Sequence, residues 1–269
     1  MNPNQALWEK GDFTRIAESM SESGEELARK LGVTKGLKVL DLGCGDGTTA
    51  LPEARLGAHV LGVDIARNLV EAGNKRAKEA GLANCKFQEG EATDLSDLKD
   101  ATFDLVVSIL GAMFAEAVRR RQGNDPRHTA RRPDRHGELD PERSDAGGAN
   151  PEDQFRLLAA PARGLRQSND LGIERNVIER FGAAGVPNDR ISFVRDTYTF
   201  RFASPPAQLV DAFRNYYGPT MNAFDAAEKS GRSEDLKKEL DDLFDNQNES
   251  PVAGATVIPA TYLRVTVTR

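Results

Sequence analysis

Cysteine is scarce and long apolar runs are missing, and each absence excludes a class of protein. Only Cys44 and Cys85 occur in 269 residues, too few for a disulfide framework, so both are expected to be free thiols. No apolar run approaches the roughly 20 residues that span a bilayer. The start, MNPNQALWEKGDF, lacks the basic and apolar regions of a signal peptide. The sequence therefore favours a cytoplasmic protein without a membrane span.

Histidine is also scarce, and the charge balance is acidic. His59, His128 and His136 share no metal-ligand spacing, so no metal site is expected. The formal net charge of -6 at pH 7 argues against nucleic acid as a partner. With 39% hydrophobic residues, the chain is an ordinary globular one, long enough for one large domain or two small ones.

Short apolar strands alternate with amphipathic helices between residues 37 and 110. Buried parallel strands are continuous apolar runs, whereas amphipathic helices repeat their apolar residues every three to four positions. The patterns predict a helical lead-in over 14–31, strands at 37–43, 59–64, 85–90 and 103–110, and helices at 48–57 and 68–81 between the first three strands. This alternation predicts an α/β fold with a doubly wound parallel sheet.

The first strand ends in a glycine-rich turn, DLGCGDG, at the edge where such sheets bind ligands. Gly43, Gly45 and Gly47 let the backbone approach a ligand, although a tight turn without a ligand would also use them. Asp64 ends the second strand, where a carboxylate can accept hydrogen bonds from both hydroxyls of a ribose. Asp41 would repel a pyrophosphate and attract an ammonium. These features favour S-adenosylmethionine, which has an ammonium, a sulfonium and no phosphate, over a dinucleotide.

The segment VLDLGCGDGTTALPEARLGAHVLGVDIARNLVEAG resembles the cofactor-binding half of class I S-adenosylmethionine-dependent methyltransferases. Within that class it is most similar to the small-molecule branch that includes quinone-biosynthesis enzymes, and the resemblance is specific over residues 37–115. It implies a Rossmann-like sheet, S-adenosyl-L-methionine as cofactor and a small-molecule methyl acceptor. The chain shows no Ser, His and Asp set and no other recognisable catalytic residue, and methyl transfer to an activated acceptor can rest largely on alignment and desolvation.

The resemblance also implies a set of cofactor-binding residues. Asp41 would lie near the methionine ammonium, and Asp64 would bind the ribose. The remaining members of the set are the backbone of Gly43 and Gly45, Ile65 packed on the adenine, Glu91 and the N–H of Ala92 at the adenine edge, and Ser108 with Ile109 beside the methionine and its methyl group. The family usually has Asp where Glu91 stands, and Glu91 keeps the charge with one more methylene.

Two segments near the C-terminal end, 190–202 and 256–269, alternate like strands. The resemblance implies that they form the antiparallel pair that closes the sheet. Helices are predicted between them at 208–224 and 234–244, where similar enzymes carry an insertion over the acceptor pocket.

Two aromatic groups have alternative interpretations. Tyr216, Tyr217, Met221 and Phe224 either line the acceptor pocket or pack the lid helices on the sheet. The lead-in segment 8–13, with Trp8 and Phe13, either forms a flap over the cofactor or caps a surface helix.

The segment 116–171 does not fit the pattern of the rest of the chain. Its only β-branched or aromatic residues are Val118, Thr129 and Phe155, and it holds 11 of the 25 arginines but none of the lysines. Its basic stretch is typical of a nucleic-acid-binding arm, but such an arm normally mixes both cations. Arginine without lysine indicates instead a GC-rich gene translated in another frame.

Codons chosen for Glu116 onward and translated one base later can encode KPFDVAKEMIRVTRPGGRIVMGNWIP, which supplies the helix, Pro-Gly-Gly turn and fifth strand that the resemblance requires. We therefore hypothesise paired frame changes near Ala115 and Gly172. The expected organisation is a helical lead-in at 1–36 and a methyltransferase domain at 37–269. Its parts are a cofactor-binding half (37–115), an irregular segment without a regular fifth strand (116–172), and a C-terminal half (173–269) with a helical lid at about 205–250. A catalytically impaired cofactor-binding homologue is the alternative to an active enzyme.

Replacing residues 116–171 by the shifted-frame sequence should raise the melting temperature and increase methyl transfer. The present segment is too poor in apolar residues to offset an ordering cost of roughly 1 to 2 kcal/mol per residue. Hydrogen exchange of the parent chain is the direct check, because amides of residues 131–145 should exchange much faster than those of residues 37–42. Equal protection of the two segments would contradict the frame-change hypothesis.

Overall fold

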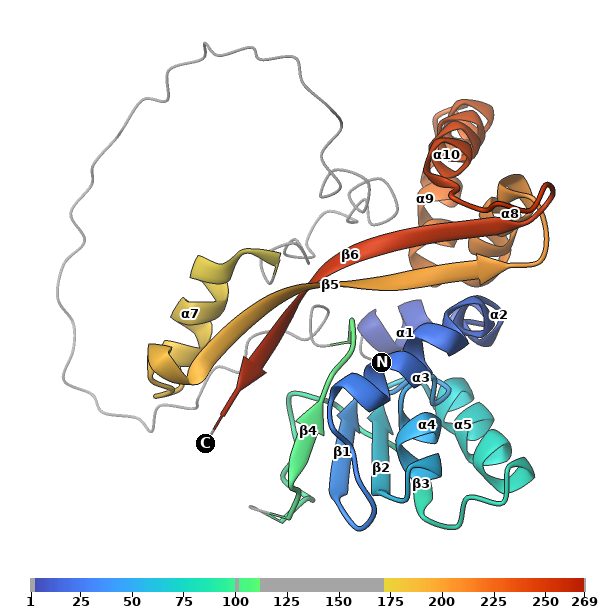
Figure 1. Ribbon diagram of the computed structural model, residues 1–269. Coiled ribbons are helices and arrows are strands. Elements are labelled where there is room, and N and C mark those ends of the chain that lie inside the picture. Colours follow the sequence, from blue (N-terminus) through green and yellow to red (C-terminus); the bar gives the residue numbers. More distant parts are fainter. Residues whose placement is uncertain (1–2, 100–101, 112–171, 269) are drawn as a thin grey trace, which may run out of the picture.

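A computed structural model describes residues 3–99, 102–111 and 172–268 (Figure 1). The predictions for residues 116–171, including the missing fifth strand, lie outside the described residues. No helix within the described ranges is long and apolar enough to cross a membrane.

The first half of the described chain is built on a parallel sheet of four strands in the order β3-β2-β1-β4. The strands are β1 (Lys38–Leu42), β2 (His59–Asp64), β3 (Cys85–Glu89) and β4 (Leu105–Val107). Helix α4 (Ala50–Arg55) joins β1 to β2, and α5 (Arg67–Glu79) joins β2 to β3. The predicted alternation of strands and helices is confirmed, and all three strand pairings are parallel.

Strand β4 is shorter than the predicted 103–110. Its regular pairing with β1 stops at Val107, which lies opposite Asp41. Beyond it, the Ser108 hydroxyl donates a hydrogen bond to the Leu42 carbonyl at 2.6 Å. Leu110 then adopts a φ of 59°, a conformation that extended strands do not contain. The turn after Val107 therefore ends strand β4, although the apolar residues of the sequence continue to Leu110.

Phe87 organises the core between the sheet and its helices. Its side chain is 6% exposed, and its ring lies against three glycines. A Cβ at Gly47, Gly62 or Gly73 would come within 2.7, 2.7 and 2.8 Å of that ring. Both cysteines are buried in the same half and are free thiols, as expected. The Phe87 ring thus occupies the space that side chains at these three glycine positions would need.

The N-terminal lead-in is helical, as predicted, and is preceded by a further short helix. Its elements are α1 (Pro3–Glu9), α2 (Thr14–Ala17), the 3-10 turn η1 (Glu18–Met20) and α3 (Ser21–Lys30). Gly32 follows α3 with a φ of 70°, the left-handed conformation that commonly ends a helix.

The second half is a long antiparallel ribbon with helices around it. Strand β5 (Ile191–Phe202) pairs with β6 (Thr256–Val267) along its full length, which confirms the two predicted strands. The ribbon is preceded by α7 (Glu174–Ala183), which the sequence analysis did not predict, and by the 3-10 turn η4 (Asn188–Arg190). Three helices connect its two strands: α8 (Pro206–Tyr216), α9 (Gly218–Lys229) and α10 (Ser233–Gln247). The predicted helix 208–224 is two helices, because Tyr217 is extended and Pro219 cannot donate a helical hydrogen bond.

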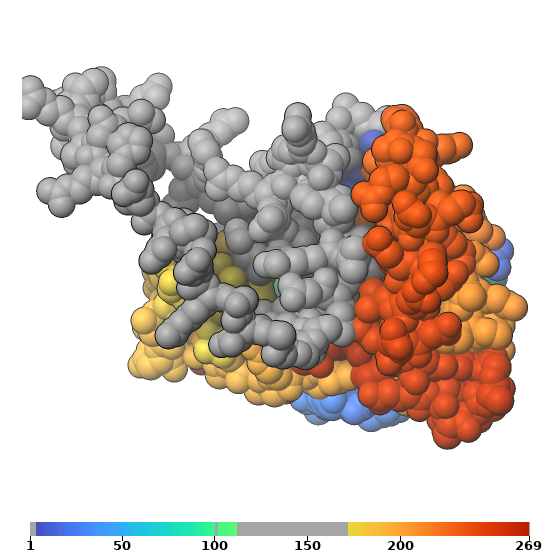
Figure 2. Space-filling model, turned by 90° about the horizontal axis from the view of Figure 1, so that it is seen from above, coloured from blue at the N-terminus to red at the C-terminus, as the bar shows by residue number. Residues whose placement is uncertain are grey.

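The ribbon does not close the parallel sheet, contrary to expectation: among the described residues β5 and β6 form a sheet of their own. The ribbon passes over the end of the parallel sheet, close to the N-terminal helices (Figure 1). Its apolar side chains Tyr198 and Ile258 are buried with Ile16 of the lead-in and with Leu209 and Phe244 of the lid helices. Packing on these helices gives the ribbon a core separate from that of the parallel sheet. Seen from above, the segment that carries α9 and α10 lies along one side of the molecule (Figure 2).

Gly73→Ala and Gly182→Ala form a matched pair of helix substitutions. At Gly73 the new methyl group would press on Phe87, so overpacking of about 1 to 3 kcal/mol should outweigh the roughly 1 kcal/mol gained in helix propensity. At Gly182 in α7 nothing lies within 4 Å of the new methyl group, so the substitution should be neutral or stabilising. Urea unfolding of both variants measures the difference, and equal effects would show that Phe87 is not constrained.

Candidate functional site

The glycine-rich loop after β1 is held between the ends of β2 and β4. The Gly43 N–H donates to the Val63 carbonyl at 2.8 Å. A Cβ on Gly43 would lie 2.9 Å from the Cα of Gly111, which follows β4. Gly43, Gly45 and Gly47 have φ values of 68°, 56° and 93°. The turn therefore needs these glycines for its backbone conformation as well as for the close approach of the two loops.

Asp64 ties this loop to the end of β2. Its Oδ2 accepts the Gly45 N–H at 2.8 Å, and its Oδ1 accepts the Ala66 N–H at 2.9 Å. Burial raises the pKa of this carboxyl, and the backbone hydrogen bonds oppose that rise. Each carboxylate oxygen has a second lone pair, so Asp64 can still accept two hydroxyl donors from a ligand.

Asp41 lies on β1 next to the same loop and is 2% exposed. Burial, with a further contribution from the charge of Asp64, raises the pKa of Asp41 to about 7. Ser108, whose hydroxyl bonds to Leu42, follows β4 on the other side of β1. The structure thus brings Asp41, Asp64, Ser108 and the glycine loop to one edge of the sheet, as the sequence predicted.

A pocket of about 510 Å³ opens beyond the ends of β2 and β3. The residues that line it are Gln5, Ile65, Glu89, Gly90 and Glu91. Two of these, Ile65 and Glu91, are residues expected to bind an adenine. Ala92, the third residue of that expected group, follows Glu91 directly and is half-buried.

Helix α1 reaches across this pocket, a feature that the sequence analysis missed. The Gln5 amide donates to Glu89 Oε1 at 3.1 Å and to Glu9 Oε1 at 3.1 Å. Glu9 in turn accepts the Arg67 N–H at 3.1 Å. Glu89 also pairs with the Arg67 guanidinium at 3.1 Å. Sequence patterns give no signal for this role of Gln5, because Glu89, which it meets at the pocket, lies far away in the sequence on β3.

The aromatic rings of the lead-in lie between the glycine-rich loop and the helices α8 and α9. The Phe13 ring lies 3.8 Å from the position that a Cβ on Gly45 would take. Trp8 and Tyr217 pack edge-on at a ring separation of 5.6 Å, and both contact the Phe13 ring. Phe224 is 5% exposed and belongs to the lid core, so ordinary packing accounts for that residue.

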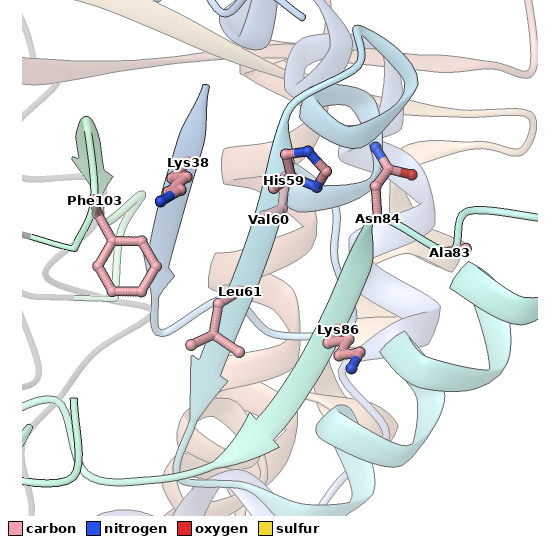
Figure 3. Close-up of a pocket in the computed structure, with 8 residues that line it drawn as sticks. All are labelled: Lys38, His59, Val60, Leu61, Ala83, Asn84, Lys86 and Phe103. Atoms are coloured by element: carbon pink, nitrogen blue, oxygen red, sulfur yellow. The ribbon is translucent and has the colours of Figure 1, made fainter. Parts of the chain in front are cut away.

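A second pocket, of about 410 Å³, lies at the opposite edge of the sheet, where the strands begin (Figure 3). It is lined by Lys38, His59, Val60, Leu61, Ala83, Asn84, Lys86 and Phe103. Ligands of parallel sheets bind beyond the carboxyl ends of the strands. None of the expected site residues lies here, so the glycine-loop edge is the candidate site.

Comparison with known proteins shows similarity to methyltransferases. Residues 33–125 match the family described as a methyltransferase domain. A curated protein of Mycobacterium tuberculosis, itself uncharacterised, is 28% identical over 228 residues, which cover 82% of this chain and 79% of that protein. Ubiquinone biosynthesis O-methyltransferase of Maricaulis maris is 41% identical over 75 residues, 28% of this chain and 29% of that enzyme. The solved structure of the YcgJ protein of Bacillus subtilis has a TM-score of 0.50 and 16% identity, covering 92% of this chain and 98% of its own, and shows the shared fold.

The resemblance to class I S-adenosylmethionine-dependent methyltransferases is confirmed over residues 33–125, which include the parallel sheet, its glycine turn and the acidic strand ends. Over these residues the chain matches the family described as a methyltransferase domain. Its cofactor is S-adenosylmethionine, and the residues present fit that molecule. Asp64 retains acceptors for a ribose, the pocket beside Ile65 has room for a base, and the glycine loop offers the cradle that side chains would fill.

Proposed function

We propose that this chain transfers a methyl group from S-adenosylmethionine to a small-molecule acceptor. The observation that carries the proposal is the Asp64 carboxylate, which is held by two backbone N–H groups and keeps one lone pair on each oxygen for a ribose. The proposed cofactor-binding residues are Asp41, Gly43, Gly45, Asp64, Ile65, Glu91, Ala92 and Ser108.

Each of these residues has a distinct part in holding the cofactor. Asp64 accepts the two ribose hydroxyls, and Ile65 packs on the adenine within the pocket that it shares with Glu91. The Glu91 carboxylate accepts a hydrogen bond from the adenine amino group. Asp41 lies beside the glycine loop, where its charge attracts the methionine ammonium.

The bound cofactor supplies a methyl group on a positively charged sulfur. The chain has to align the acceptor with that methyl group and exclude water. Ser108 lies beside the glycine loop at the end of β4, and Phe13 covers the loop near Gly45. No general base is needed for an acceptor that is already nucleophilic.

A small molecule is the acceptor class that the surroundings favour. Phe13, Trp8 and Tyr217 put an apolar, aromatic wall above the loop, which suits an apolar ring better than a polymer. The partial similarity to an enzyme named for ubiquinone biosynthesis supports the same class. We retain the division into a lead-in at 1–36 and a methyltransferase domain at 37–269 with a lid at about 205–250.

A second candidate function is cofactor binding with impaired transfer. Within the described residues, β4 pairs with β1 alone, and its other edge meets no strand. In the part of the chain that the structure describes, strand support for the loop that carries Ser108 therefore comes from the β1 side alone. Labelled-methyl transfer by the parent chain and by the chain carrying the shifted-frame sequence separates the two candidates. Transfer by both supports the enzyme, and transfer by the repaired chain alone supports the impaired homologue.

Asp64→Ala should weaken binding of S-adenosylmethionine by roughly 1.5 to 3 kcal/mol, because it removes charge-assisted hydrogen bonds to the ribose. Asp64→Asn is the matched control. It keeps one acceptor oxygen, but its NH₂ group faces a backbone N–H, so an intermediate loss is expected. Titration calorimetry measures both variants. Unchanged affinity of Asp64→Ala, or tighter binding of NAD than of S-adenosylmethionine by the parent chain, would refute the proposed site.

A further inference from the structure

Three carboxyl groups are buried together behind the glycine-rich loop. Asp41 on β1 is 2% exposed, Asp64 at the end of β2 is 8% exposed, and Glu53 on α4 is 0% exposed. Asp41 lies on the same face of β1 as Val39, because side chains alternate along a strand. Val39 packs in the core with Ala50 and Ala54 of α4, the helix that also carries Glu53.

Glu53 has no role in the proposed binding of the cofactor, yet its side chain is completely enclosed. Neither of its carboxyl oxygens has a hydrogen-bond partner within the part of the chain that the structure describes. An ionised carboxylate in that position would lose its hydration without compensation. Burial, and then the charge of Asp41, raise the pKa of Glu53 to about 9. Glu53 is therefore a neutral carboxylic acid at pH 7.

Asp41 is poised differently from Glu53. Burial and the charge of Asp64 raise the pKa of Asp41 to about 7, well above its ordinary value. Near neutral pH the ligand-free protein thus contains both protonated and ionised forms of Asp41. The two acids therefore differ near neutral pH: Glu53 keeps its proton, whereas Asp41 can lose its proton.

The other titratable groups that face the pair bring no compensating positive charge. Cys44 in the loop and Cys85 on β3 have thiol pKa values raised mainly by burial, that of Cys85 to about 12. Burial likewise raises the pKa of Tyr198, which faces the pair from β5. The nearby guanidinium of Arg76 is paired with Asp46 at 2.5 Å. Among the described groups, the charge that can balance an ionised Asp41 therefore has to come from the ligand.

We propose that cofactor binding to this protein is linked to proton release: the cationic methionine end of S-adenosylmethionine displaces the proton of Asp41 into solvent, while Glu53 stays protonated. The inference rests on the proposed position of the ammonium beside Asp41. Because Glu53 is neutral, no second negative charge beside Asp41 raises its pKa further, and Asp41 can ionise at neutral pH when the cationic ligand binds. Affinity for the cofactor consequently rises with pH through the neutral range.

The same linkage fixes how the stability of the ligand-free protein depends on pH. The unfolded chain loses the Asp41 proton near the ordinary value of 3.8, whereas the folded chain keeps it to about 7. The folded state therefore binds more protons between these values, and its stability falls as the pH rises through that window. Glu53 extends the fall from 4.5 to about 9. The stabilisation that the cofactor gives should grow over the Asp41 window.

Calorimetry in buffers of different ionisation enthalpy measures the protons released on binding. At about pH 6 the parent chain should release most of one proton per S-adenosylmethionine, and its affinity should rise about fivefold to about pH 7. The ligand's own amino group remains largely protonated in this range. Cofactor binding without proton release would overturn the inference and leave the proposed function standing. Failure of the parent chain to bind the cofactor would instead refute the proposed site itself.

Two variants show which residue loses the proton that is released when the cofactor binds. Asp41→Asn should abolish proton release. If this variant binds too weakly for calorimetry, its ligand-free melting temperature should fall less steeply with rising pH below about pH 7 than that of the parent chain, because only the Glu53 contribution remains. Glu53→Gln keeps the shape and neutrality of the protonated acid, so its affinity should stay within about twofold and its proton release unchanged. A shift of the Glu53→Gln binding profile to lower pH by about one unit would show that Glu53 is ionised, and would overturn its assignment.

Discussion

The hydrogen bonds that two backbone N–H groups donate to the Asp64 carboxylate hold the site together. One oxygen takes the N–H of Gly45, in the loop after β1, and the other takes the N–H of Ala66, at the start of α5. Two loops that leave neighbouring strands are thus fixed to a single side chain. The positive φ angles of the glycines then set the backbone path of the loop, and Ile65, which lines the pocket, directly follows Asp64 in the chain.

Much of this arrangement could be predicted from the sequence, because the strands are apolar runs with polar ends. Strand β2 begins at His59 and ends at Asp64, as predicted, since these two polar residues bound the apolar stretch between them. Strand β4 could not be delimited in this way. Its apolar run continues past Val107, and its end is set by the contact of Ser108 with β1 and by the left-handed Leu110. Such tertiary constraints leave no mark on periodicity.

The sequence also gave no reason to single out Glu53 or Gln5. A glutamate in an amphipathic helix is normally solvent-exposed, but five of the six residues of α4 are buried, because the helix is covered on nearly all sides. Gln5 acquires its place only when α1 folds back over β3. The residues that bind through the strand ends were therefore predictable, whereas the two that depend on the packing of whole helices were not.

Helix α1 joins the pocket beside Ile65 to the helices α8 and α9. On one side, Gln5 bonds to Glu89 and Glu9 accepts the Arg67 N–H, both beside the pocket. On the other side, Trp8 packs on Tyr217 between α8 and α9. Lys10 extends this side by pairing with Asp225 of α9 at 2.5 Å. Because the polar contacts at the pocket and the aromatic contact with Tyr217 both come from this one helix of seven residues, displacing α1 from one set of partners would also strain the other.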